Sequence, residues 1–257
     1  MAESTVSYPL VRERNLILAS LLVLAAAAWA LLVWQSSTAD EEMMGLTMGM
    51  GAPLFLAIWV AMMVAMMFPT AAPMILTFAR VQTGKRQRGQ AFVPAWVFVG
   101  AYLTVWTAFG ALAYGIAVGG ETLADHWMWL MDNAARIGGL VVVLAGLYQL
   151  SPLKRSCLSK CRTPIQFIMS SWRDGYGGSF RMGLEHGSYC LGCCWLLFVI
   201  LFPLGMMNVA AMAVITLLIF AEKSLRVGRQ MGHVGAAAMV AYGVLVMFVP
   251  SALPTMM

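Results

Sequence analysis

The chain has 257 residues, of which 61% are hydrophobic and only 11% are charged. Soluble domains carry about 25% charged residues, so this composition excludes an ordinary soluble protein and predicts an integral membrane protein. The net charge of +5 does not indicate nucleic-acid binding, because membrane proteins retain basic residues in their short cytoplasmic loops.

Seven apolar runs approach the length of about 20 residues that a helix needs to cross a bilayer. The run at 137–150 is short, so it must extend back toward residue 133 or pack inside the bundle, and six spans are the fallback. We therefore expect an all-α, polytopic transmembrane helix bundle that forms one membrane domain over residues 1–257. In chain order, the runs are 15–34, 53–78, 94–118, 137–150, 184–204, 208–221 and 232–250.

The basic residues predict the orientation of this bundle. With the N-terminus in the cytoplasm, the cytoplasmic segments hold all of the 16 lysines and arginines except Arg136. Because basic residues are retained on the cytoplasmic side, the opposite orientation is hard to defend. The longest cytoplasmic segment is a loop at 151–183, where Pro152, Pro164 and the glycines of 175–178 should interrupt any long helix.

The second run contains a cluster of methionines. Met62 and Met66 share one helical stripe, and Met63 and Met67 share the adjacent one, just before Pro69. Thioethers are soft, neutral ligands that suit Cu(I), so Met63, Met66 and Met67 are candidate ligands. The alternative is ordinary packing, because methionine also fills irregular apolar gaps.

Three other groups leave alternatives open. The segment 40–50, expected outside, combines acids with methionines and is either a copper-gathering segment or a solvated loop. Cys157 and Cys161 lie four apart among basic residues, and they form either a metal-docking or thiol-exchange loop or ordinary free thiols. Glu222 and Lys223 end the run at 208–221, where we favour a structural role for the pair.

An imidazole and three thiols stand at the start of the run at 184–204: His186, Cys190, Cys193 and Cys194. Coordinating side chains are rare inside spans and usually mark function. Spacings of three and four residues place the imidazole and two of the thiols along a single stripe of the helix, with the third thiol about 100° around it. On the expected topology the cysteines lie on the reducing side or in the bilayer, which favours free thiols or metal ligation over disulfides. The alternative is that these residues only pack or cap the helix.

The motifs resemble a bacterial family described as predicted metal-binding integral membrane proteins, which includes the membrane copper chaperone associated with a bacterial tyrosinase. The resemblance covers about residues 62–229 and implies copper handling in the bacterial inner membrane. It is carried by Met62-Met63-x-x-Met66-Met67-x-Pro69, Pro152-Leu153-Lys154-x-x-Cys157-x-x-x-Cys161, His186-Gly187-x-x-Cys190-x-Gly192-Cys193-Cys194, Gly205-x-Met207-Asn208 and Glu222-Lys223.

We therefore expect a membrane copper-binding protein that holds Cu(I) in the helix bundle and delivers it to a copper enzyme. It would act as a chaperone or accessory subunit rather than as an enzyme, with membrane lipid and a copper-dependent enzyme or other membrane subunits as partners. The expected inner site is His186, Cys190, Cys193 and Cys194, and the expected relay near the midplane is Met63, Met66 and Met67.

Two alternatives use the same residues. The first is a metal-binding subunit of a membrane copper oxidase or monooxygenase complex, which is disfavoured because the chain has only three histidines and copper–oxygen chemistry usually relies on several. The second is a membrane thiol oxidoreductase that uses Cys190 and Cys193. Their expected position on the reducing side disfavours that function.

Overall fold

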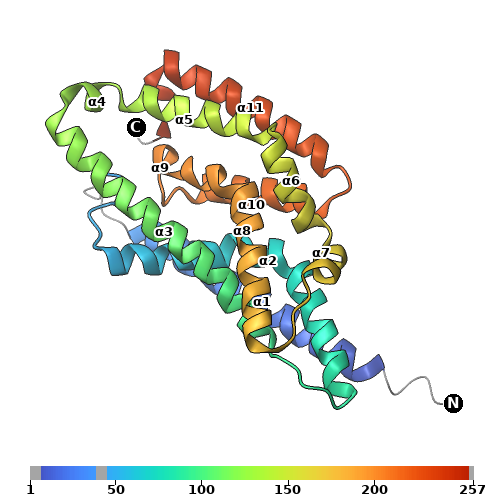
Figure 1. Cartoon of the computed structure of the whole chain (residues 1–257). Coiled ribbons are helices and arrows are strands. Elements are labelled where there is room, and N and C mark those ends of the chain that lie inside the picture. The colour runs from blue at the N-terminus through green and yellow to red at the C-terminus, as the bar shows by residue number, and fades with distance from the viewer. Residues whose placement is uncertain (1–6, 39–44, 255–257) are drawn as a thin grey trace.

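The computed structural model describes residues 7–38 and 45–254, and within them every regular element is helical. This confirms the all-α class. In chain order (Figure 1), the elements are α1 (Ser7–Thr38), α2 (Ala52–Gln87), α3 (Ala95–His126), α4 (Met128–Asp132), α5 (Ala134–Gln149), α6 (Pro152–Arg162), α7 (Pro164–Ser171), α8 (Gly175–Val199), α9 (Leu201–Leu204), α10 (Val209–Ser224), α11 (Gly228–Phe248) and the 3-10 turn η1 (Pro250–Ala252).

Five stretches of helix are long and apolar enough to cross a membrane alone: α1, α2, α3, α8 with α9, and α11. A sixth span results if α5 and α6, which are bent by 63° to each other, count as one. The 16 residues of α10 reach only about 24 Å at 1.5 Å per residue, less than the ~30 Å of hydrocarbon. Helix length and composition therefore support five or six of the seven expected spans. Helix α5 begins at Ala134, so the short run at 137–150 extends back toward residue 133, one of the two outcomes expected for it.

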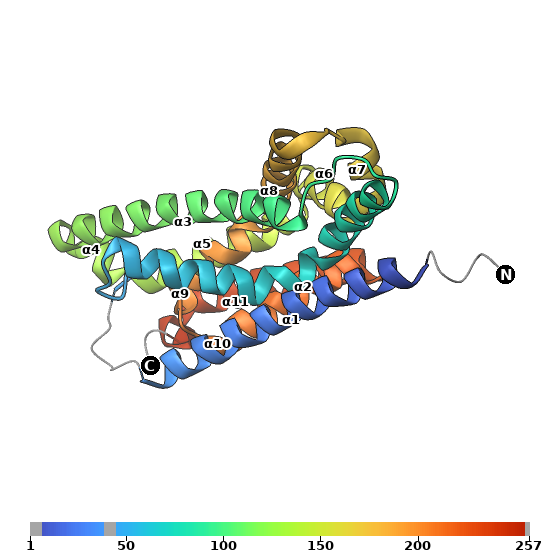
Figure 2. The same ribbon diagram turned by 90° about the horizontal axis from the view of Figure 1, so that it is seen from below.

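The helices form two closely associated groups. Helix α1 lies along α2, and α3 packs against both α2 and α8, while α5 and α11 run side by side along the upper edge of Figure 1. Figure 2 shows α1 following α2 over most of its length. Helix α10 contacts α2, α11 and α6. It therefore links the two groups near the end of α8.

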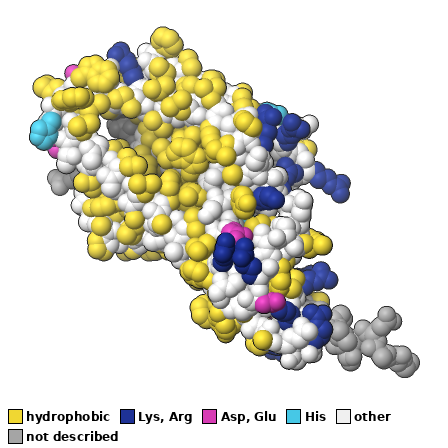
Figure 3. Space-filling model, viewed as in Figure 1, with side chains coloured by type: hydrophobic (Ala, Val, Ile, Leu, Met, Phe, Trp, Pro, Cys, Tyr) yellow, Lys and Arg dark blue, Asp and Glu magenta, His cyan; other side chains and the backbone are white. Residues whose placement is uncertain are grey.

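Charged side chains are distributed unevenly over the surface. Lysines and arginines gather on the right and lower right of Figure 3, on the side that carries α6 and α7, whereas hydrophobic side chains dominate the upper left. This one-sided distribution fits the expected orientation, in which the basic segments share one side of the membrane.

The segment 151–183, expected as a cytoplasmic loop, consists largely of the short helices α6 and α7 and the first turns of α8. Pro152 and Pro164 stand at the first position of α6 and α7, where the missing N–H is not needed and the fixed φ suits a helix. The side chain of Ser151 accepts a hydrogen bond from the Lys154 amide and caps α6. Gly175 adopts a φ of 77° and starts α8, which contains the other glycines that were expected to break a helix.

Two glycines allow α8 to approach α3 closely. A Cβ added to Gly187 would lie 2.9 Å from Cγ2 of Val105, and one added to Gly183 would lie 2.7 Å from the Cβ of Ala101. Small residues four apart are a common means of bringing membrane helices together. This close approach places the face of α8 that carries His186 and Cys190 directly against α3.

Helix α2 continues through Pro69, whose missing N–H leaves the carbonyl of Ala65 without its usual helical donor. The indole Nε1 of Trp29, on α1, donates to that carbonyl at 3.0 Å. A neighbouring helix thus satisfies the freed backbone group, as bundles require in lipid. The bond joins α1 to α2 beside the methionine cluster.

Candidate metal site

Three thiols from two helices meet inside the bundle. The Sγ atoms of Cys190 and Cys193, on α8, and of Cys161, near the end of α6, all lie within 4.8 Å of one another. Cys190 and Cys193 are buried, and Cys161 is partly exposed as a residue although its thiol is buried in the cluster. All five cysteines of the chain are free thiols. The Cys193 thiol also donates to the carbonyl of Cys190 at 3.1 Å. We call Cys161, Cys190 and Cys193 the thiol cluster.

The other two cysteines lie beside this cluster. The buried Cys194 has its Sγ 3.2 Å from that of Cys193. Cys157 lies one turn before Cys161 on α6 and faces Gly192, where an added Cβ would come within 2.7 Å of its sulfur. The two thiols of α6 therefore have different surroundings. Spacing along the chain gave no sign that Cys161 rather than Cys157 would join the thiols of α8.

Two polar side chains contact the sulfur of Cys190. The hydroxyl of Tyr102, on α3, lies 3.2 Å from Sγ, and Nζ of Lys223, on α10, lies 3.0 Å from it. Both residues are buried. Four helices thus converge on the cluster, since α3 and α10 supply these contacts and α6 and α8 supply the thiols.

An ion pair lies next to Lys223 and involves its chain neighbour. Glu222 accepts a hydrogen bond from Nζ of Lys154 at 2.7 Å and one from Nε2 of Gln149 at 3.1 Å. The side chains of Lys154 and Glu222 are only 3% and 2% exposed. Lys154 was expected among the basic residues of a cytoplasmic loop, and Glu222 and Lys223 were expected to act as a pair. Instead, the carboxylate of Glu222 binds Lys154, and the ammonium of Lys223 contacts Cys190.

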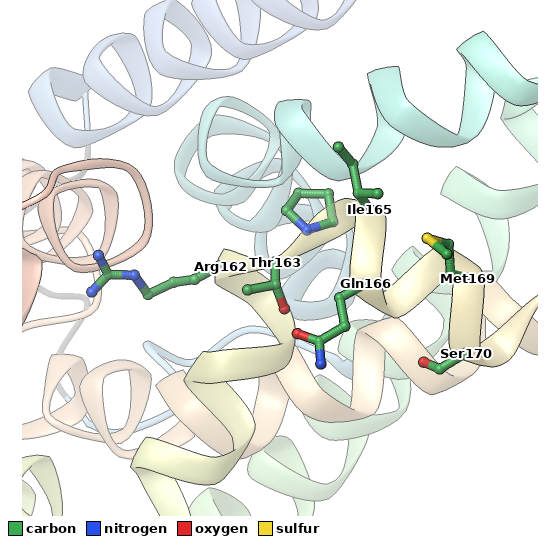
Figure 4. Close-up of a pocket in the computed structure, with 7 residues that line it drawn as sticks. Arg162, Thr163, Ile165, Gln166, Met169 and Ser170 are labelled. Carbon is green, nitrogen blue, oxygen red and sulfur yellow. The ribbon is translucent and has the colours of Figure 1, made fainter.

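The end of α6 is tied to α10 by a further bond. Nη2 of Arg162 donates to the carbonyl of Leu225 at 3.0 Å. Arg162 directly follows Cys161, so this bond helps to hold the third thiol near α10. An open surface hollow of about 660 Å³ begins here, and none of its lining residues belongs to the thiol cluster. Figure 4 shows six of them labelled: Arg162, Thr163, Ile165, Gln166, Met169 and Ser170.

His186 is buried in an aromatic cage. Its ring stacks with those of Phe98 and Tyr102 at centroid distances of 5.8 and 5.6 Å, and the ring of Phe167 from α7 meets it edge-on at 5.6 Å. Its Nδ1 has no hydrogen-bond partner among the described residues. His186 lies one turn from Cys190 but is not one of the three mutually close ligands.

The three candidate methionines of α2 are fully buried. Met63, Met66 and Met67 belong to the same hydrophobic core as the cysteines of α8. Helices α2 and α8 contact each other through the rings of Trp59 and Phe198, whose centroids are 6.3 Å apart. The expected midplane relay and the thiols therefore share one core.

The outer segment is only partly described, because residues 40–44 lie outside the described residues. In the remainder, the amide and hydroxyl of Thr47 donate to Oε1 of Glu121 at 2.7 and 3.0 Å. The carboxylate of α3 therefore anchors the chain just before α2. Met50 is buried nearby, two residues before α2 begins at Ala52.

Most of the chain matches the model of a known protein family. The family model PpoB2, described as a copper chaperone, matches residues 56–246 and so includes all four helices that meet at the thiol cluster. No curated protein and no solved structure matches the chain.

Proposed function

The chain belongs to the PpoB2 family of copper chaperones, and from this premise we propose that it binds Cu(I) at the thiol cluster and delivers it to a copper-dependent enzyme. The observation that carries the proposal is the meeting of Cys161, Cys190 and Cys193 within 4.8 Å. Thiolates are soft ligands that select Cu(I) over hard cations. Three of them on two helices can hold one ion.

The construction of the cluster suits transfer as well as binding. Cys190 and Cys193 belong to a long helix, whereas Cys161 lies near the end of the short α6 in a residue that is partly exposed, although its thiol is buried in the cluster. A partner's ligand that approaches from this side can replace the Cys161 thiol while the pair on α8 still holds the ion. Cys161 is therefore the proposed exchange ligand.

Further soft donors extend the proposed path. Cys194 and His186 lie beside the thiol cluster on α8, and the thioethers of α2 occupy the same core. Neutral thioethers bind Cu(I) more weakly than thiolates do and release it readily. We assign the relay role to Met63, Met66 and Met67.

The membrane setting is part of the proposal. The apolar helices and the one-sided basic surface (Figure 3) support a multi-pass protein of the bacterial inner membrane with a cytoplasmic N-terminus. We propose that α5 and α6 form one broken span. In this orientation the thiol cluster lies in the cytoplasmic half of the bundle.

Metal analysis of anaerobically purified protein tests the proposal. Wild type should retain copper, Cys193→Ser should lose it, and Cys157→Ser is the matched control because its thiol lies outside the cluster. Absence of copper from wild type, with a Cys190–Cys193 disulfide found by mass spectrometry, would instead support a thiol oxidoreductase.

Delivery needs a separate assay. Cells that lack the protein should produce copper enzyme without its metal, and wild type but not Cys193→Ser should restore enzyme activity. Substrate turnover by the isolated copper-loaded protein would contradict the chaperone role and favour an oxidase subunit.

A further inference from the structure

Lys223 is a buried cation that contacts a thiol rather than a carboxylate among the described residues. Its residue is only 9% exposed, and its Nζ contacts the sulfur of Cys190 at 3.0 Å. The neighbouring carboxylate of Glu222 is engaged by Lys154 and Gln149. Among the described residues, no carboxylate lies within ion-pair distance of Lys223. Since an isolated buried charge is very costly, this ammonium requires an anion at the thiols.

When the cluster holds copper, the formal charges of the buried side chains and of the bound ion show which group can be that anion. The formal charges of Lys154, Glu222 and Lys223 together leave one positive charge unbalanced. A Cu(I) ion bound by two thiolates carries one negative charge, and an ion bound by three carries two. The metal–thiolate complex therefore supplies the counter-charge that the protein lacks at this point.

We propose that Lys223 is the charge-compensating residue of the copper site, donating to the Cys190 sulfur and stabilising the anionic copper–thiolate complex. This inference rests on the proposed function. A charged ammonium has no lone pair for the metal, so Lys223 acts through Cys190 rather than as a ligand. The hydroxyl of Tyr102, 3.2 Å from the same sulfur, is the second group that can donate to it.

The surrounding contacts hold Lys223 in this position. Its chain neighbour Glu222 is bonded to Lys154 near the start of α6, and Arg162 at the end of α6 bonds to the carbonyl of Leu225. These two bonds fix the last turn of α10 against the helix that carries Cys161. The same pair of helices, α6 and α10, therefore fixes the position of the Lys223 ammonium relative to the Cys161 thiol.

The test compares Cu(I) affinity by competition with a chromogenic Cu(I) chelator, using full-length protein in detergent. Groups that hydrogen-bond to metal ligands typically change metal affinity by about 10- to 100-fold when removed. We expect Lys223→Met to bind copper that much more weakly, with the same stoichiometry. Lys223→Arg, which keeps the charge, should recover most of the affinity. Lys85→Met is the control, since it removes an equal charge at the ion pair with Asp174.

Two results would overturn the proposed role of Lys223. Unchanged affinity in Lys223→Met overturns the inference, and so does Lys223→Arg binding as weakly as Lys223→Met, because shape rather than charge would then matter. If Lys223→Met fails to fold, Lys223→Gln takes its place. This variant removes the charge but keeps a donor toward the sulfur, so unchanged copper affinity would show that the charge is not needed. Wild type that binds no copper would refute the proposed function instead.

Discussion

Replacing Glu222 with leucine should strongly destabilise the bundle, because it leaves the ammonium of Lys154 buried and unpaired. Exposed ion pairs contribute only about 0–1 kcal/mol. This pair is different, since its side chains are 3% and 2% exposed and its atoms are 2.7 Å apart. Removing one partner of such a buried pair typically costs about 3–5 kcal/mol. Gln149 would lose its acceptor as well.

A double-mutant cycle isolates the pair from other effects. Lys154→Met should cost a similar amount, because it leaves the Glu222 carboxylate buried without its cation. The double variant Lys154→Met/Glu222→Leu removes both charges, and apolar replacements of buried pairs are often neutral or stabilising. It should therefore be more stable than either single variant.

Reversible unfolding in mixed detergent micelles measures these differences, and the nine tryptophans of the chain provide the fluorescence signal. If the loss in the double variant equals the sum of the single losses, the two charges are not coupled. Lys154 and Glu222 would then contribute to stability independently rather than as a buried pair.

Three other substitutions test separate parts of the structure. Cys161→Ser should reduce copper retained after dialysis against a chelator, whereas Cys157→Ser should not, and equal loss in both would contradict the cluster. Gly187→Leu should overpack the α3–α8 contact and cost about 1–3 kcal/mol in thermal unfolding; Gly177→Leu, which meets open space, should have little effect. Trp29→Phe should cost about 1–3 kcal/mol, because a buried carbonyl of α2 loses its donor; an unchanged unfolding midpoint would show that another group satisfies it.

The helical class and most spans could be predicted from the sequence, because both depend on local properties. A run of apolar residues must form a helix in lipid regardless of its neighbours, which is why α1, α2, α3, α8 and α11 were all expected. The extension of α5 to Ala134 was also expected, since it depends on length alone. The shared face of Cys190 and Cys193 follows from helical periodicity in the same way.

The seventh span and the short helices within 151–183 were harder to predict. The run at 208–221 is apolar, but α10 is too short to cross the bilayer alone. In 151–183, prolines were interpreted as helix breakers, although Pro152 and Pro164 begin helices. From sequence alone, a proline that begins a helix cannot be told from a proline in a loop. The contacts that the next residues make in the folded chain distinguish the two.

Hydropathy and helical periodicity act over a few turns, so the sequence alone predicted an all-α chain with several helices apolar enough to cross a membrane and a helix face that carries thiols. The partners of that face depend on contacts between distant parts of the chain. Lys223 reaches Cys190 from 33 residues away, and Lys154 reaches Glu222 from 68. Local sequence cannot specify which distant charge a buried group will meet, because that depends on how helices far apart in the chain pack together. The addition of Cys161 to the thiols of α8 was decided in the same way, by the bend between α5 and α6.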